Sequence, residues 1–161
     1  MELRWIKNGK EIFPGIEEGV LEIDFYPGIP MEVLFGSASP QSSTDEDERK
    51  WPINESNVAI KEILEDELTR KALFYNLHKS DLRVNCINLF HFTVREDKLN
   101  LYVFARSMNM KNMGYDLVTI DKIYNNVLAG INKEMPVKVD IGKVTVRINS
   151  LHYYKDETFK S

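Results

Sequence analysis

The segment VNCINLFHFTVREDKLNLYVFARS, residues 84–107, decides the fold of this chain. Two long apolar runs flank a short polar turn at 95–97, a pattern typical of an antiparallel β-hairpin. The hairpin places Cys86 at the start of one strand and Arg106 at the end of its neighbour. Because a fixed cation stabilises the reactive thiolate, this arrangement makes Cys86 a candidate nucleophile and Arg106 its activating group.

Two helices are expected around this hairpin. The stronger pattern covers residues 116–132, where apolar side chains share one broad face: Leu117, Ile120, Ile123, Tyr124, Val127, Leu128 and Ile131. The weaker pattern falls between Val58 and Leu68, with Asn54 or Ser56 as its cap.

The remaining apolar segments are short and are expected to be strands, at 3–7, 20–25 and 72–77. The first strand should end at Asn8-Gly9, a dipeptide favoured in tight hairpins. The last apolar stretch, 137–154, should form a second hairpin that turns at Gly142. This order predicts an α+β fold around a mixed, mostly antiparallel β-sheet.

The composition is that of an ordinary globular protein. With 161 residues, 43% of them hydrophobic, the chain should form a single domain, 1–161, with a polar loop at about 37–50. The net charge of −4 and the pI of about 5.5 argue against binding to nucleic acid through its phosphates.

The cysteine and histidine content limits the chemistry further. One cysteine allows no internal disulfide, and three scattered histidines predict no metal site. No stretch approaches the roughly 18 apolar residues of a membrane span, and no signal peptide is recognisable at the N-terminus. We therefore expect a soluble cytoplasmic protein without a membrane partner.

The residues alone leave a structural interpretation open for each candidate. A lone cysteine at a strand edge is most often a small buried hydrophobe. Arg106 is compatible with a solvated charge or a structural ion pair. Arg70 and Lys71 are compatible with favourable charges at the C-terminus of the first helix. His152 and Tyr154 share one strand face, as a ligand-binding pair or an ordinary core edge would.

Several short motifs occur in an order that resembles the thymidylate synthase superfamily. The run from Cys86 through Arg106-Ser107 to Asn109 is similar to its nucleophilic cysteine, hairpin and Arg-Ser-x-Asp segment. Three further segments resemble family motifs: Thr69-Arg70-Lys71, Gly114-Tyr115-Asp116-Leu117 and His152-Tyr153-Tyr154. Glu32 before Val-Leu-Phe is a looser match. The resemblance covers about residues 30–155 and is strongest from 69 to 154.

This resemblance implies a thymidylate synthase-like three-layer fold and a homodimer that buries sheet against sheet. It also implies C5 one-carbon transfer to a pyrimidine deoxynucleotide monophosphate, with 5,10-methylenetetrahydrofolate as the donor. Cys86 would attack C6 of the base, and Glu32 would organise water and protons around the ring.

The same resemblance assigns the substrate contacts. Arg106 would bind the phosphate, together with Arg70 and Lys71 from the neighbouring subunit. His152 and Tyr154 would bind the sugar 3′-hydroxyl. The remaining substrate-binding positions implied by the family motifs are Ser107, Asn109 and Asp116.

Two substitutions relative to the family pattern affect the expected substrate and activity. Asp116 stands where dUMP-specific members have Asn; a carboxyl group accepts from the exocyclic amine of cytosine and, when protonated, donates to N3. Asp116 thus favours dCMP, and the family at large favours dUMP. Asn109 replaces an Asp, and Ser161 follows soon after Tyr154, where family members continue into a tail over the folate. These departures leave a non-catalytic nucleotide-binding relative as the alternative.

Overall fold

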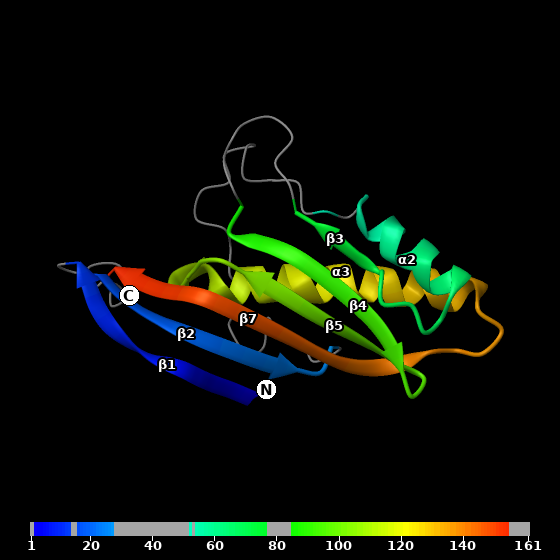
Figure 1. Ribbon diagram of the computed structural model, residues 1–161, viewed down its shortest axis with the longest axis horizontal. Coiled ribbons are helices and arrows are strands. Elements are labelled where there is room, and N and C mark those ends of the chain that lie inside the picture. Colours follow the sequence, from blue (N-terminus) through cyan, green and yellow to red (C-terminus); the bar gives the residue numbers. More distant parts are fainter. Residues whose placement is uncertain (1, 14–15, 28–51, 53, 77–84, 155–161) are drawn as a thin grey trace.

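The computed structural model describes residues 2–13, 16–27, 52, 54–76 and 85–154 (Figure 1). The strands of this part are β1 (Glu2–Phe13), β2 (Ile16–Phe25), β3 (Leu73–Tyr75), β4 (Ile87–Arg95), β5 (Lys98–Ala105), β6 (Met108–Asn109) and β7 (Asp140–Tyr154). The helices are α2 (Ser56–Glu65), α3 (Met113–Glu134) and the short 3-10 turn η1 (Met110–Asn112). The expected polar loop at 37–50 lies outside the described residues.

One open mixed sheet carries the fold, which confirms the α+β class. Its strands lie in the order β1-β2-β7-β5-β4-β3, and the short β6 extends the pairing along β7. β5 and β6 pair with β7 in parallel, whereas all other neighbours are antiparallel. The helix α3 makes the crossover that a parallel pair requires.

Both helices pack on the same side of the sheet. α3 lies along one sheet face, and α2 packs against α3 and the edge strand β3 (Figure 1). The described residues therefore form two layers, whereas the sequence resemblance led us to expect three. The opposite face of the sheet carries no described helix.

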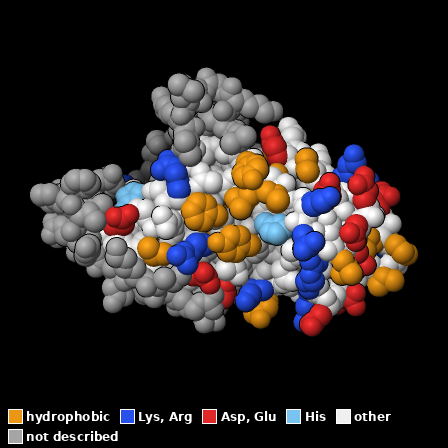
Figure 2. Space-filling model, in the orientation of Figure 1, with side chains coloured by type: hydrophobic (Ala, Val, Ile, Leu, Met, Phe, Trp, Pro, Cys, Tyr) orange, Lys and Arg blue, Asp and Glu red, His pale blue; other side chains and the backbone are white. Residues whose placement is uncertain are grey.

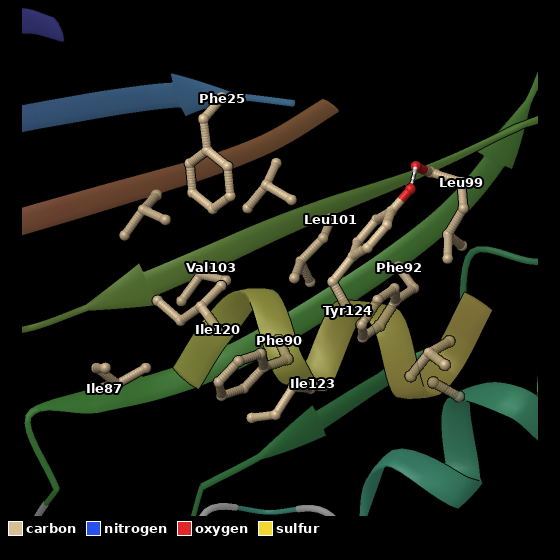
Figure 3. Packing of buried hydrophobic residues seen from close by; sticks show 14 of the residues in the cluster. Phe25, Ile87, Phe90, Phe92, Leu99, Leu101, Val103, Ile120, Ile123 and Tyr124 are labelled. Carbon is tan, nitrogen blue, oxygen red and sulfur yellow. Dashed lines mark hydrogen bonds between the residues drawn. The ribbon is translucent and has the colours of Figure 1, made fainter. Parts of the chain in front are cut away.

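The core fills the space between α3 and the sheet (Figure 3). Phe90 and Phe92 point inward from β4, and Tyr124 lies against Phe92 with ring centroids 6.4 Å apart. The Tyr124 hydroxyl donates to the backbone oxygen of Leu99 at 2.7 Å and accepts from the backbone N–H of Gly142 at 3.1 Å. One side chain of α3 thereby connects β5 and β7.

The central hairpin and the long helix agree with the sequence prediction. β4 and β5 pair from Ile87 opposite Ala105 to Arg95 opposite Lys98. In the expected turn between them, Glu96 and Asp97 have positive φ values of 51° and 59°. Two consecutive positive φ values define the type I′ geometry that suits the twist of a two-residue hairpin. The predicted helix 116–132 lies within α3, which begins three residues earlier and ends two later.

Two expected turns are wrong, because the strand continues through the glycine at each position. β1 continues through Asn8-Gly9, with a register irregularity between Lys7 and Lys10. β7 continues through Gly142, so residues 140–154 form one strand and not a hairpin. A Cβ at Gly142 would lie 2.3 Å from the Leu99 backbone oxygen, so this glycine permits close strand approach.

Candidate active site

One end of the sheet collects most of the candidate residues. β4 begins there, β5 ends there, and the short segment β6–η1 then leads into the first turn of α3 (Figure 1). Cys86 precedes β4, and Arg106 and Ser107 follow β5. The antiparallel register of this hairpin thus brings together residues 20 positions apart in the sequence.

The structure places Cys86 and Arg106 on adjacent backbone segments. The backbone N–H of Ser107 donates to the Cys86 carbonyl oxygen at 3.4 Å. The Arg106 side chain donates through Nε to the carbonyl oxygen of Asn85 at 2.9 Å, one peptide before the cysteine. Cys86 itself is exposed, so its interpretation as a buried hydrophobe is wrong.

β7 adds His152 to this group. The Ser107 hydroxyl lies 3.3 Å from Nδ1 of His152, and the β6–β7 pairing sets Asn109 opposite His152. Nδ1 also lies 3.4 Å from the Ser150 carbonyl oxygen. A carbonyl oxygen only accepts, so Nδ1 can contact Ser150 only as a donor, whereas the Ser107 hydroxyl can either donate to Nδ1 or accept from it. The Ser107 contact is therefore compatible with either tautomer of His152.

Asp116 lies in the first turn of α3, at the same end of the sheet. Its side chain is half-buried, and loss of hydration on burial raises the pKa of this carboxyl from 3.8 to about 7. A carboxyl with this pKa is present in both protonation states near neutral pH. It can thus act as hydrogen-bond donor as well as acceptor toward a ligand.

Three asparagines around Cys86 form a network that sequence reasoning missed. Asn76 donates to the Ile87 carbonyl oxygen at 3.1 Å, and Asn85 donates to the Asn76 carbonyl oxygen at 2.8 Å. Asn88 donates to the Asn85 carbonyl oxygen at 2.7 Å and accepts from the backbone N–H of Arg106 at 2.8 Å. The visible signal was a pair of amides flanking the cysteine, in Asn85-Cys86-Ile87-Asn88.

Arg70 and Lys71 lie apart from this group within one chain. They precede β3, whose first residue pairs with His91, well along β4 from Cys86. α2 ends at Glu65 with no basic residue in its last turn, so their interpretation as helix-terminal charges is wrong. Nε2 of His91 lies 3.1 Å from the Arg70 carbonyl oxygen and fixes the backbone there.

Two further candidates cannot be placed in the site. Glu32 lies outside the described residues. Tyr154 is described only through its backbone, which pairs with Ile16 at the end of β7.

No protein-family model matches the chain, and no curated protein matches it either.

Among the described residues, no helix combines the length and apolarity needed to cross a membrane. The same part of the chain holds no group of three or more His, Cys, Asp or Glu residues arranged for a metal ion.

Proposed function

We propose that this protein transfers a one-carbon unit to C5 of a pyrimidine deoxynucleotide monophosphate through a covalent adduct with Cys86. The observation that carries the proposal is the convergence of Cys86, Arg106, Ser107 and His152 at one end of the sheet. Cys86 precedes β4, Arg106 and Ser107 follow β5, and His152 lies on β7 beyond the crossover helix α3. The resemblance to thymidylate synthases names all four residues.

The chemistry begins with the thiol of Cys86. Its thiolate adds to C6 of the base and forms an S–C6 bond, and the electrons of the C5=C6 double bond move onto C5 and the C4 substituent. C5 is then a nucleophile that bonds to the one-carbon unit and loses its proton to water. With methylenetetrahydrofolate bound, the donor amine would be the leaving group, and water would complete a hydroxymethyl group or a hydride from the reduced folate a methyl group. Expulsion of the thiolate restores the double bond. Arg106, whose Nε donates to the Asn85 carbonyl oxygen one peptide before Cys86, is the cation that we assign to the reacting thiol and to the phosphate.

Asp116 is the residue that we assign to the base edge. With a pKa of about 7, its carboxyl can hold a proton at neutral pH. A protonated carboxyl donates to N3 of cytosine and accepts from the exocyclic amine. We therefore place dCMP before dUMP as the substrate, and expect dCMP affinity to fall as the pH rises through about 7 because the proton is lost.

The sheet face on which no described helix packs supports the homodimer. Side chains of alternating residues on three strands make this face apolar at its centre: Leu73, Tyr75, Leu89, His91, Tyr102 and Phe104. Tyr75 is 58% exposed and Tyr102 39%, and Figure 2 shows hydrophobic side chains gathered at the middle of this face. A second copy would bury this apolar surface, and Arg70 beside it could then reach the partner's phosphate site.

The donor proposed is 5,10-methylenetetrahydrofolate, which supplies the electrophilic carbon when it is bound. Asn109 stands where the family pattern has an Asp, and we expect this change to affect folate binding. The side-chain oxygen of Asn109 accepts from the Lys111 backbone N–H at 3.0 Å. It thereby caps η1. The described residues do not provide a recognisable folate site.

The test is release of tritium from C5. Purified protein is incubated with dCMP or dUMP tritiated at C5, with and without methylenetetrahydrofolate, and tritium in water is measured. Release that disappears in Cys86→Ala supports the enzyme. A wild-type protein that binds either nucleotide but releases no tritium contradicts it.

The alternative is a non-catalytic nucleotide-binding protein of the same fold. The observation that favours it is Asn109, an amide with a capping role where the family has a carboxylate. In this case nucleotide binding would be unchanged in Cys86→Ser and no tritium would be released.

A further inference from the structure

We infer that Asn88 is a positioning residue, which holds Arg106 in its place next to Cys86. The inference rests on the proposed function, because it concerns how the proposed nucleophile and its activating group are brought together. It adds a residue that the family motifs do not contain.

Asn88 occupies an irregularity in the β4–β5 pairing. Ile87 pairs with Ala105 and Leu89 with Phe104, so Asn88 is the extra residue of a bulge. A bulge leaves part of the regular ladder unpaired. Here the side-chain oxygen of Asn88 accepts from the Arg106 backbone N–H and replaces that ladder bond.

The orientation of the Asn88 amide follows from its partners. The Arg106 N–H can only donate, so it must face Oδ1 of Asn88; the Asn85 carbonyl can only accept, so it must face Nδ2. The backbone oxygen of Asn88 accepts in addition from the Asn76 N–H at 2.9 Å. One residue therefore connects the ends of β3 and β5 with the segment that carries Cys86.

Arg106 is held at two points that depend on Asn88. Its backbone bonds to Asn88 directly, and its Nε bonds to the Asn85 carbonyl, which Asn88 also contacts. Loss of the Asn88 amide would release both the backbone of Arg106 and the carbonyl that orients its side chain. The expected consequence is a guanidinium that is no longer fixed beside the segment carrying Cys86, and a thiol that reacts more slowly.

The experiment measures alkylation of Cys86, the only cysteine, by iodoacetamide at neutral pH with intact-mass detection. Asn88→Ala should slow alkylation by about fivefold, the size expected for one net hydrogen bond. The double variant Asn88→Ala/Arg106→Ala should react no more slowly than Arg106→Ala alone, because the amide acts through the arginine.

Asn100→Ala is the matched control. The Asn100 amide also accepts from a backbone N–H of a neighbouring strand, that of Lys143 at 3.0 Å, but toward the opposite end of the sheet. Asn100→Ala should lose about as much thermal stability as Asn88→Ala, and its Cys86 should be alkylated at the wild-type rate. If Asn88→Ala is alkylated at the wild-type rate while Arg106→Ala is alkylated slowly, the positioning role of Asn88 is overturned and the pairing of Cys86 with Arg106 still stands. A wild-type rate in Arg106→Ala would overturn the pairing of Cys86 with Arg106, and this inference with it.

Discussion

At the scale of single residues, Asp116 makes stability depend on pH. Below about pH 4 its carboxyl is protonated in the folded and unfolded chain alike. Because burial raises the pKa of the folded state to about 7, the unfolded chain ionises first as the pH rises. Ionisation then favours unfolding, so the contribution of Asp116 to stability falls between about pH 4 and pH 7.

The substitution Asp116→Asn should remove this dependence. The difference in melting temperature, variant minus wild type, should increase from about pH 4 to pH 7 and then stay constant. Asp140→Asn, at an exposed position, serves as the control. Calorimetry provides the melting temperatures. A difference between Asp116→Asn and wild type that stays the same from pH 4 to pH 7 would contradict the raised pKa of Asp116.

Gly142 illustrates how a single residue can mislead sequence reasoning. Glycine between apolar runs usually indicates a turn, yet here it lies inside β7, where the backbone of β5 comes too close for a Cβ. The turn was predicted from local pattern alone. The correct role depends on the Leu99 oxygen, more than forty residues earlier in the chain, which no local pattern contains.

We expect Gly142→Ala to destabilise the protein by about 2 kcal/mol, because the new Cβ would meet backbone that cannot yield. Gly130→Ala is the matched control. Its Cβ would meet Cδ1 of Ile60 at 2.5 Å, the far end of a flexible side chain, and alanine favours a helix by up to about 1 kcal/mol. Urea unfolding of both variants checks the difference; equal stabilities would show that β7 and β5 adjust.

At the scale of elements, α3 is attached to the sheet by the hydroxyl of Tyr124. This hydroxyl bonds one backbone group on β5 and one on β7, at a point where both are buried. The helix and the hairpin were predictable because each has a long, regular apolar pattern. The attachment was not, because an amphipathic pattern places Tyr124 on the inner face without specifying its partner.

Tyr124→Phe should lower the free energy of unfolding by about 1–3 kcal/mol, because it leaves the Leu99 oxygen and the Gly142 N–H without this partner. Ring packing against Phe92 should persist, so the variant should fold. Chemical denaturation provides the measurement. A variant as stable as wild type would mean that water replaces the hydroxyl.

At the scale of the whole molecule, one sheet face is covered by helices and the other is apolar and bare in the described part. The bare face has a charged border, where Lys143 lies 3.7 Å from Asp24 and Arg147 lies 3.8 Å from Glu22. An apolar centre with a polar rim is the usual anatomy of an interface between proteins. This surface was expected from the family resemblance and not from residue patterns.

Tyr102→Asp should prevent self-association, because it places a charge at the centre of the face that we propose to be buried. Sedimentation velocity would detect the change from dimer to monomer. Val137→Asp, at a residue 69% exposed between α3 and β7, should leave the dimer intact. A wild-type protein that is monomeric at high concentration would refute the proposed dimer.

Part of the candidate site could be predicted from local sequence, and the rest depends on contacts between distant segments. Cys86, Arg106 and Ser107 lie on a hairpin, whose geometry follows from local sequence, and the structure brings them together. Joining His152 to them required the register of a parallel pair across α3, and only the family resemblance supplied it. Asn88 could not be predicted, because a bulge depends on the fit of two strands.

The position of β7 in the sheet has a consequence for how the chain reaches its native state. β1 and β2 connect to β5, β4 and β3 only through β7, the last described strand in the sequence. During synthesis, the first hairpin leaves the ribosome long before the strand that joins it to the rest. One edge of β2 stays available to other chains in that interval, and contacts this distant in sequence form slowly. The newly made protein should therefore depend on chaperones more than its size suggests.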